Sequence, residues 1–430
     1  MKHILLFGAG KSATVLIDYL KLTANEKKWR VTVADMNLAA VQSKVGEDVW
    51  VKAVGISIEH EAERMALIKD ADVVISLLPP ALHYFVAIDC LAAGIHLLTA
   101  SYVDERIKAL AGEIKTKGIL FLCEMGLDPG IDHMSAMLLI HRIQQEGGRI
   151  RSFLSHCGGL VAPECDDNPW HYKISWNPRN VVLAGKAGAV YREKSEVRSL
   201  EYGELFVDCK QVFVEGIGQL AYYPNRDSLS YIPVYWLEET ETFVRTTLRH
   251  PDFCEGWNRI IQLGLTDEET MIDTDGLSIS AFLKQHFLSK NLFINTGDEL
   301  LQKQFLFLGL EDQSLINKGV CSTADILQFI IEQKWVLHQQ DKDMIVMKHE
   351  IGYEVNGEWS MVNSTLVVKG EDNLRTAMAK TVGLPLGIAA TLLLEGKIKE
   401  TGLHIPIIPG IYEPVLKLLA EHGIVFKESD

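Results

Sequence analysis

The sequence predicts an α/β protein with a doubly wound parallel sheet, followed by a mixed α+β region that carries an inserted α-helical subdomain. Three observations lead to this fold class. A glycine-rich loop directly follows the first apolar strand. Short apolar strands then alternate with segments of helical length through the first third of the chain, which is typical of a parallel sheet with helices on both faces. From about residue 150, strand-like segments follow one another with few helices between them.

Length, charge and cysteine usage limit the class of protein. A chain of 430 residues is expected to form roughly two or three domains. Its formal net charge of −15 disfavours nucleic acid as a partner, because phosphates require a basic face. The seven scattered cysteines include no C-x-x-C pair, so we expect free thiols in a reducing compartment and no metal site. We see no signal peptide and no apolar run of the ~18 residues that span a membrane, so we expect a cytoplasmic protein that enters no membrane.

The first loop has the spacing of a dinucleotide-binding turn. In "HILLFGAGKSA", Gly8 allows the tight turn, Gly10 lets the backbone approach a pyrophosphate, and Ala13 lets the next helix pack closely on the strand. The next strand, "RVTVAD", ends in Asp35, near the spacing at which an acid accepts hydrogen bonds from an adenosine ribose. We therefore expect a Rossmann-type domain that binds a dinucleotide. The alternative is the same fold without a nucleotide.

Further buried strands are predicted at 71–80, 94–102 and 118–126. Ligands of such sheets lie at the carboxyl ends of the strands. These ends carry Pro79-Pro80, Ser101-Tyr102 and Asp128-Pro129-Gly130. The last group belongs to "CEMGLDPGIDHM" (123–134), which fits either a plain strand-to-helix turn or the floor of an active site. Because the sheet would put this turn at the ligand edge, we expect both interpretations to hold.

The second half of the chain predicts a mixed sheet that two separate segments build. "RSFLSHCGGL", "QVFVEGIGQLAYYP" and "FVRTTLR" read as strands, and Asn356-Gly357 is a hairpin signal inside 343–370. The expected division is a Rossmann domain over 1–130 completed by 371–430, a mixed-sheet domain over 131–250 and 338–370, and a helical insert over 251–337.

Positive side chains gather in the mixed-sheet region. Arg226 lies in the turn "YPNRDS", Arg245 and Arg249 lie in "RTTLRH", and Lys173 and Arg179 lie in a stretch rich in Gly, Pro and Trp. A guanidinium binds a carboxylate through two hydrogen bonds, so such a set suits a substrate with several carboxylates. The alternative for any one of them is a surface or structural salt bridge.

Three other side chains are candidates for proton transfer. His133 and His156 have the intrinsic pKa of acid–base groups, although a lone histidine is more often structural. Cys157 precedes Gly158-Gly159, a pair that permits close backbone approach. Its thiol could donate a weak hydrogen bond or pack as a small apolar group.

Nine motifs occur in this order along the chain: "GAGKSA", "ISLLPPALH", "TASY", "GLDPGIDHM", "CGGLVAPE", "NPWHYKISW", "YPNRDS", "TLR" and "MAKTVGLPLGIAA". Together they resemble the saccharopine dehydrogenases that form L-glutamate, also called saccharopine reductases. The fourth, fifth and sixth motifs are far more specific than the glycine motif. The resemblance runs along nearly the whole chain. It implies a three-domain subunit whose mixed-sheet domain binds the substrate and forms a homodimer.

The motifs and the resemblance imply roles for individual residues. The candidate catalytic residues, which would handle protons, are Asp128, Tyr102 and Cys157. Expected substrate contacts are Ser101, Tyr102, Asp128, Arg226, Thr247, Leu248 and Arg249. Expected cofactor contacts are Gly8, Gly10, Lys11, Ser12, Ala13, Asp35, Leu77, Leu78, Pro79, Leu127, Asp128, Pro129 and Asn177, the last standing where many relatives carry a serine.

The reaction that the resemblance implies is the oxidation of the secondary amine of saccharopine, in lysine metabolism. Hydride passes to a nicotinamide cofactor, and the imine is hydrolysed to L-glutamate and 2-aminoadipate 6-semialdehyde. The reverse is a reductive condensation. Two alternatives stay open: a related reductase that joins another amine and carbonyl compound, such as a polyamine precursor, and a non-catalytic nucleotide-binding regulatory protein.

Cofactor choice is predicted from the end of the second strand. Asp35 would face the 2′-phosphate of NADP, and two negative groups ~4 Å apart repel by about 4 kcal/mol at an effective dielectric near 20. Met36 and Asn37 offer no compensating cation, and Arg30 lies ~16 Å away at the start of the strand. We therefore expect NAD to be preferred by at least about a hundredfold in catalytic efficiency, with NADP possible.

Overall fold

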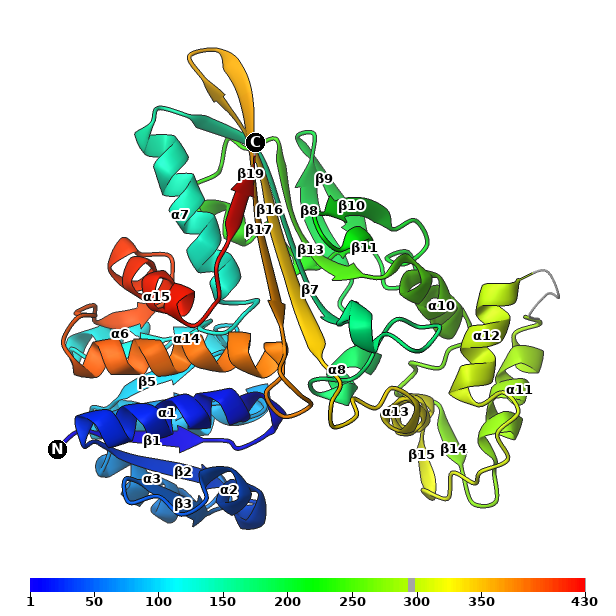
Figure 1. The fold of residues 1–430 in the computed structure, drawn as a ribbon, viewed down its shortest axis with the longest axis horizontal. Coiled ribbons are helices and arrows are strands. Elements are labelled where there is room, and N and C mark those ends of the chain that lie inside the picture. Colours follow the sequence, from blue (N-terminus) through cyan, green and yellow to red (C-terminus); the bar gives the residue numbers. More distant parts are fainter. Residues whose placement is uncertain (293–297, 430) are drawn as a thin grey trace. The chain divides into compact units, whose positions relative to one another are not determined.

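A computed structural model describes residues 1–292 and 298–429 of the chain (Figure 1). Its contacts divide it into two compact units. The first consists of Met1–Gly148 with Leu366–Lys427, and the second consists of Arg149–Thr365 with the last residues of the chain. Each unit has its own sheet and its own apolar core.

The first unit is built on a seven-stranded parallel sheet in the order β18-β6-β5-β4-β1-β2-β3. Its strands are β1 (His3–Phe7), β2 (Arg30–Asp35), β3 (Val51–Gly55), β4 (Val73–Ser76), β5 (His96–Thr99), β6 (Leu120–Leu122) and β18 (Gly402–His404). Most are short and buried, as apolar strands between two helical layers should be. β18 comes from the C-terminal segment and pairs with β6. The predicted doubly wound parallel sheet is confirmed.

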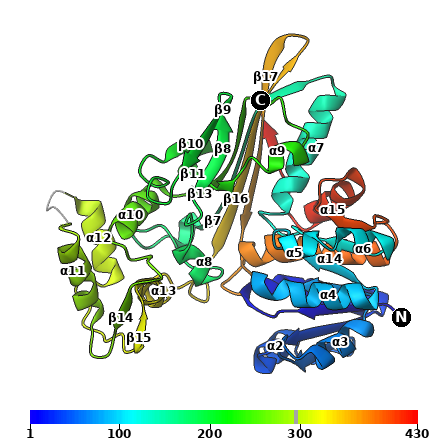
Figure 2. The ribbon, with the colours of Figure 1, turned by 180° about the vertical axis from the view of Figure 1, so that it is seen from behind.

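Helices cover both faces of this sheet. α1 and α14 lie side by side across one face (Figure 1), and α4 crosses the other face in the view from behind (Figure 2). The close approach of α14 to α1 depends on Gly383, since a Cβ there would lie 2.9 Å from the Cβ of Leu16. The helices are α1 (Thr14–Lys27), α2 (Leu38–Val45), α3 (Glu61–Lys69), α4 (His83–Ala93), α5 (Glu105–Lys108), α6 (Ala111–Thr116), α7 (Ile131–Gln145), α14 (Ala377–Leu394) and α15 (Pro409–Glu421).

Among the described helices, α14 alone is long and apolar enough to cross a membrane by length and composition, although we expected no such run. Inside the fold, 72% of its 18-residue window is buried. A helix that is apolar on all sides is what the core of a large protein also requires. Its composition is therefore accounted for by its place against α1 and the sheet.

The first unit extends to Gly148, whereas we predicted a border at residue 130. The extra segment is α7, which packs on α15. Nδ1 of His141 on α7 lies 2.7 Å from the hydroxyl oxygen of Tyr412 on α15. The C-terminal segment joins the unit at Leu366 and not at 371. The predicted borders differ from the contact-based ones because a change of sequence pattern reports local structure, whereas contacts between distant residues define a compact unit.

The second unit contains a ten-stranded mixed sheet with the main path β10-β11-β13-β7-β16-β17-β19. β7 runs parallel to β13 and antiparallel to β16. The β16–β17 hairpin turns at Asn356 and Gly357, whose φ angles of 53° and 85° suit this residue pair and confirm the predicted turn. The strands are β7 (Arg149–Val161), β8 (Ala189–Glu193), β9 (Glu196–Leu200), β10 (Lys210–Val214), β11 (Gly218–Pro224), β12 (Arg226–Asp227), β13 (Thr242–Arg249), β16 (Asp343–Val355), β17 (Glu358–Lys369) and β19 (Lys427–Ser429).

The stretch predicted as a helical insert, 251–337, is largely helical, and its residues 293–297 lie outside the described part of the chain. Contacts do not separate it from the mixed sheet. Its core is shared with the segment before β8, because the Trp335 ring packs 5.3 Å from Trp170 and 6.1 Å from Trp257. The remaining elements are α8 (Pro178–Val182), α9 (Tyr231–Val234), α10 (Pro251–Gln262), α11 (Ile279–Ser289), α12 (Glu299–Leu308), α13 (Thr323–Lys334), β14 (Met271–Asp273) and β15 (Val320–Ser322).

Candidate functional site

The glycine loop after β1 lies at the carboxyl edge of the parallel sheet. Gly8 has a φ of 102°, and a Cβ there would lie 2.6 Å from the carbonyl oxygen of Leu77, so glycine is required where β1 and β4 end. Gly10 is exposed, and a Cβ there would meet nothing within 4 Å. Lys11–Ala13, which includes Ser12, forms a short turn of 3-10 helix that leads into α1. The loop therefore has open space for a pyrophosphate beside the start of a helix.

The Asp35 carboxylate at the end of β2 is held by backbone amides. Its Oδ2 accepts from Ala9 N at 2.8 Å and its Oδ1 accepts from Asn37 N at 2.9 Å. Lys44 of α2 donates to the carbonyl oxygen of Gly10 at 2.5 Å. Burial lowers the pKa of Lys44, and the negative charge of Asp35 opposes that shift. Sequence reasoning missed this cation, because the contact joins residues 34 positions apart and no local pattern marks it.

The other predicted cofactor contacts after β4 share this edge. Leu77 N donates to Phe7 O at 2.8 Å, so the end of β4 is tied to the end of β1. Leu77 and Leu78 are half-buried and Pro79 is exposed. Their contact with a cofactor stays a prediction.

The stretch "CEMGLDPGIDHM" connects β6 to α7 at the same edge. Leu127 and Pro129 are buried, and Gly130 has a φ of 148° in a place where any Cβ would overlap the backbone of the turn. Asp128 is half-buried. The Tyr102 hydroxyl, from the loop after β5, donates a long hydrogen bond of 3.5 Å to Asp128 Oδ1. The structure thus brings two of the three catalytic candidates together and makes the turn part of the site edge.

His133 lies behind this turn in a buried network. Its Nε2 is 2.8 Å from Oε2 of Glu124, and both side chains are buried. Glu124 Oε1 accepts from Val103 N at 3.1 Å, and Asp132 Oδ2 lies 3.7 Å from Nδ1 of His133. These contacts join the ends of β5, β6 and α7. They favour the structural interpretation of His133.

Arg249, in the second unit, ends β13 and is 5% exposed. Its guanidinium centre lies 5.4 Å from the Tyr172 ring centroid and 5.6 Å from that of Phe253. Its Nη1 donates to Leu248 O at 2.8 Å, but its Nε has no hydrogen-bond partner and no carboxylate pairs with it among the described residues. A buried guanidinium without an anion is costly. The arrangement suits a carboxylate ligand.

Two other predicted cations of the second unit, Lys173 and Arg179, pair with carboxylates of the protein. Lys173 donates to Asp341 at 2.7 Å, and Arg179 donates to Asp325 at 2.8 Å. These contacts favour structural salt bridges for Lys173 and Arg179. Asn177 is exposed and caps α8, because its side chain accepts from Arg179 N at 2.9 Å. Its contact with a cofactor stays a prediction.

Cys157 lies on β7 opposite Thr247 of β13. Paired residues share a face and side chains alternate along a strand, so Cys157, Thr247 and Arg249 lie on one face of the sheet. Leu248 points the other way, into an apolar cluster, so only its backbone can meet a substrate on that face. A Cβ at Gly158 would lie 2.5 Å from Leu248 O. The close backbone approach that we predicted for Gly158 is therefore the approach of β7 to β13.

Arg226 is exposed and has a φ of 51° in the short strand β12. Its neighbour Asn225 donates from its backbone to Arg245 O at 2.8 Å. Arg245 is buried, with its guanidinium centre 4.4 Å from the Tyr231 ring centroid. Arg226 is thus the more accessible of the two arginines.

His156 is buried on the opposite face of the sheet from Cys157. Its Nδ1 lies 2.7 Å from Thr246 Oγ1, and its Nε2 lies 3.0 Å from Glu350 Oε2. Burial acts to raise the pKa of Glu350, but the hydrogen bonds of His156 and Lys348 lower it to about 2. This ion-pair network favours a structural role for His156.

His171, His250 and Asp252 form a cluster that we did not predict, with ligand-capable atoms within 4.8 Å of one another. His171 Nδ1 lies 2.6 Å from Asp166 Oδ2 and its Nε2 lies 3.3 Å from Asp252 Oδ2. The two imidazole rings stack with centroids 3.7 Å apart. The hydrogen bond with Asp166 raises the pKa of His171. The contacts of His171 with the carboxylates of Asp166 and Asp252 account for the arrangement of the cluster.

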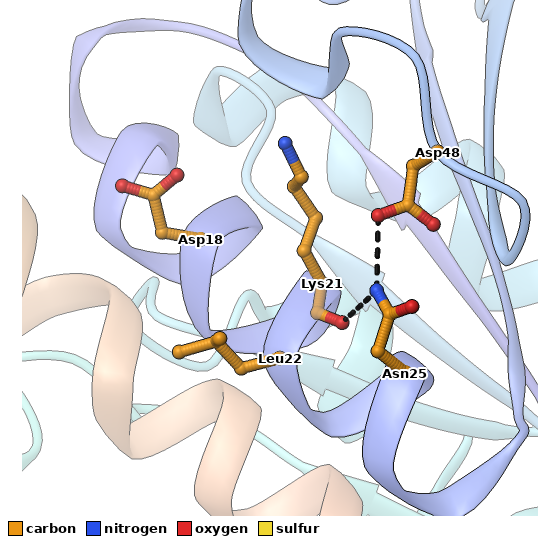
Figure 3. A pocket seen from close by; sticks show the side chains of 5 residues that line it. All are labelled: Asp18, Lys21, Leu22, Asn25 and Asp48. Carbon is orange, nitrogen blue, oxygen red and sulfur yellow. Dashed lines mark hydrogen bonds between the residues drawn. The ribbon is translucent and has the colours of Figure 1, made fainter.

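A surface hollow of about 380 Å³ lies along α1 and is lined by Asp18, Lys21, Leu22, Asn25 and Asp48 (Figure 3). The Asn25 amide donates to Asp48 Oδ2 at 3.0 Å and to Lys21 O at 2.9 Å. α1 begins at the carboxyl edge of the sheet, so these later turns lead away from that edge. We do not assign the hollow to the candidate site.

The chain is similar over its whole length to named proteins. It is 34% identical to the saccharopine dehydrogenase [NADP(+), L-glutamate-forming] of Saccharomyces cerevisiae, covering 100% of this chain and 99% of the yeast protein. The alpha-aminoadipic semialdehyde synthase, mitochondrial, of Bos taurus is 33% identical over 99% of this chain, which spans 47% of that protein.

Solved structures agree with these matches. The apo histidine-tagged saccharopine dehydrogenase (L-Glu forming) from Saccharomyces cerevisiae superposes with a TM-score of 0.90 at 32% identity, covering 100% of this chain and 99% of the other. The homospermidine synthase from Legionella pneumophila in complex with NAD has a TM-score of 0.59 at 10% identity, covering 100% of this chain and 91% of the other. The second likeness shows a shared fold alone.

The predicted preference for NAD is wrong. The family model that matches residues 4–122 describes an NADP binding domain, and the Saccharomyces cerevisiae and Schizosaccharomyces pombe relatives are named for NADP(+). The predicted repulsion requires an Asp35 carboxylate with no cation nearby. In the structure, both of its oxygens accept from backbone amides and Lys44 lies at the same loop.

Two family models together cover both units of the chain. The saccharopine dehydrogenase NADP binding domain matches residues 4–122, and the saccharopine dehydrogenase C-terminal domain matches residues 126–424. The full-length identity to the yeast protein points the same way. The chain belongs to the L-glutamate-forming saccharopine dehydrogenase family.

Proposed function

We propose that the chain catalyses the NADP-dependent oxidation of saccharopine to L-glutamate and 2-aminoadipate 6-semialdehyde, and the reverse condensation. The observation that carries this proposal is the 34% identity, along the whole chain, to a yeast protein named for the L-glutamate-forming reaction. The carboxyl edge of the first sheet and the buried Arg249 of the second agree with it.

The glycine loop would hold the cofactor. Gly8 lets the ends of β1 and β4 approach closely, and Gly10 leaves room for the pyrophosphate. Lys44 would supply a positive charge beside Asp35 for the additional phosphate of NADP. The bound cofactor would supply the hydride acceptor. The contribution of the protein is to hold the substrate carbon in line for that transfer.

Asp128 and Tyr102 are the groups that would handle protons. The substrate amine must be neutral when its carbon gives up hydride, so a proton acceptor must lie within hydrogen-bond reach. Asp128 is half-buried at the carboxyl edge, and the Tyr102 hydroxyl lies 3.5 Å from its Oδ1. Cys157 is buried beside Thr247, where its thiol would at most donate a weak hydrogen bond.

Arg249 and Arg226 would bind the substrate carboxylates. The two arginines differ in their surroundings: Arg249 is buried against two aromatic rings, and Arg226 is exposed. Ser101 is half-buried after β5 and Thr247 is half-buried on β13, and each would add a hydroxyl contact.

The homodimer and the cytoplasmic location are also part of the proposal. Trp359 and Met361 are 55% and 44% exposed on the same face of β17, and this exposed apolar pair would suit contact with a second copy. Free cysteines fit a reducing compartment. Sedimentation velocity at micromolar concentration should show a dimer, and a monomer would contradict the oligomer proposal.

The test of the activity is NADPH formation, followed at 340 nm, when saccharopine is added to the pure protein with NADP. Polyamine precursors with NADP or NADPH serve as the comparison. Turnover of saccharopine alone supports the proposal. Turnover of the polyamine precursors would favour the related reductase, and no turnover of either would favour a regulatory protein.

A further inference from the structure

His83 joins the ends of two neighbouring strands through both nitrogens of its ring. It is the first residue of α4 and is 3% exposed. Its Nδ1 lies 2.8 Å from the hydroxyl of Ser76, the last residue of β4, and its Nε2 lies 2.7 Å from the hydroxyl of Ser101, just after β5. Both distances are those of good hydrogen bonds.

This hydrogen-bonded network is shielded from solvent at the Ser76 end and reaches the carboxyl edge of the sheet at the Ser101 end. Ser76 is 0% exposed and Thr99, which lies 3.4 Å from Nδ1, is 1% exposed. Ser101 is half-buried, and its backbone N–H donates to Thr99 Oγ1 at 3.2 Å. Ser101 is therefore the member of the chain that can face a ligand.

The imidazole must be neutral near pH 7. Burial lowers the pKa of His83 to about 4, and the charge of Asp104 opposes that shift only partly. A neutral imidazole carries one N–H and one lone pair. The two bonds must therefore run in one direction: either Ser76 donates to Nδ1 and Nε2–H donates to Ser101, or both bonds are reversed.

We propose that His83 is a positioning residue that makes the Ser101 hydroxyl a hydrogen-bond donor to an oxygen of the bound substrate. This inference rests on the proposed function and deepens it. In the first direction, Ser101 Oγ accepts from Nε2–H and keeps its own proton for the substrate. In the reverse direction, the Ser101 hydroxyl donates its proton to Nε2 of His83. Ser101 Oγ and a substrate carboxylate oxygen would then face each other as two acceptors with no proton between them. A neighbouring donor in the same chain also polarises the hydroxyl.

The first test is a double-mutant cycle on saccharopine kinetics. His83→Leu removes both hydrogen bonds, Ser76→Ala removes only the inner one, and Ser101→Ala removes the outer hydroxyl. We expect His83→Leu and Ser101→Ala each to lower kcat/KM for saccharopine about tenfold, and Ser76→Ala to lower it several-fold. In the Ser101→Ala background, His83→Leu should cost less than about twofold, because both changes break the same bond. The affinity for NADP should stay unchanged in all variants.

The control is His141→Leu, which removes a hydrogen bond of 2.7 Å to Tyr412 in the same unit but none to Ser101. It should leave the saccharopine KM unchanged, and melting temperatures report whether each variant is folded. Additive losses of His83→Leu and Ser101→Ala would overturn the inference and assign His83 to structure alone.

A second measurement tests the free protein independently of turnover. Nitrogen-15 NMR of labelled histidine should show His83 as the neutral Nε2–H tautomer at pH 7. The Nδ1–H tautomer, or a charged ring, would overturn the inference even if the protein turns over saccharopine. If the protein turns over no saccharopine but shows the Nε2–H tautomer, the proposed function fails, whereas the direction assigned to the Ser76–His83–Ser101 hydrogen bonds is supported.

Discussion

Substitution of Arg249 by methionine should weaken saccharopine binding and at the same time stabilise the free protein. Methionine keeps the length and apolar character of the side chain but removes the charge. In the free protein this guanidinium is 5% exposed, packs beside the contacting rings of Tyr172 and Phe253, and pairs with no carboxylate of the described chain. Function and stability therefore place opposite demands on this position.

The size of both effects follows from these contacts. Loss of a charge-assisted contact to a substrate carboxylate costs about 1.5–3 kcal/mol, which is roughly a ten- to hundredfold rise in the Michaelis constant. Replacement of a buried charge by an apolar side chain is neutral or stabilising by about 1–4 kcal/mol. Lost cation–π contacts offset about 0.5–2 kcal/mol of that gain. A net gain of about 1 kcal/mol would raise the melting temperature by about 2–4 °C in a unit of this size.

The assay combines saccharopine titration at saturating NADP with thermal unfolding in the presence and absence of saccharopine. Arg179→Met is the matched control, since this arginine is paired with Asp325 and Glu268. The control should leave the Michaelis constant unchanged and lower the melting temperature slightly. A normal Michaelis constant in Arg249→Met, together with a melting temperature several degrees lower, would refute the assignment and show that Arg249 only supports the core.

Three further outcomes are expected. Asp128→Asn should lower turnover at least tenfold while the melting temperature stays within a few degrees, because a half-buried edge residue contributes little to the core; normal turnover would return Asp128 to a turn-forming role. Lys44→Met should raise the dissociation constant of NADP, measured by fluorescence titration, by roughly tenfold and that of NAD by less; equal changes would show that Lys44 does not contact the additional phosphate. The pKa of His171 is raised in the folded state by its hydrogen bond with Asp166, so its stabilisation is fully present below the unfolded pKa of about 6.5 and is lost as pH rises through the folded pKa. His171→Asn should therefore lower the melting temperature more at pH 6 than at pH 9, and an equal loss at both would contradict this role.

The parallel sheet could be predicted because its signals are local. Short apolar runs bounded by turns encode buried strands, and the glycine loop encodes a backbone shape that side chains forbid. Gly8 illustrates this: a Cβ there would meet the Leu77 carbonyl. The Asn356-Gly357 turn is equally local, since both residues adopt positive φ. For the same reason, the motif around Asp128 could be assigned to the site edge from the strand that precedes it.

Pairing between distant side chains could not be predicted in the same way. Arg179 and Arg249 look alike in sequence, but Arg179 meets Asp325, which lies 146 positions further along the chain, whereas Arg249 meets aromatic rings and no described carboxylate. Lys44 faces the glycine loop across 34 positions. The cofactor prediction failed at this point, because the electrostatic environment of Asp35 depends on a cation that only the folded chain brings near.

Residue types and their spacing alone determined the fold class and the glycine loop, because these depend on backbone conformation and burial over short distances. The family was indicated by the resemblance of nine ordered motifs. The tertiary structure decided which candidate side chains have protein partners and which are left for a ligand. His83 shows the physical reason: a histidine in sequence has no protonation state or direction of hydrogen bonding. Burial keeps it neutral, and the hydroxyls at the ends of β4 and β5 hold its two nitrogens.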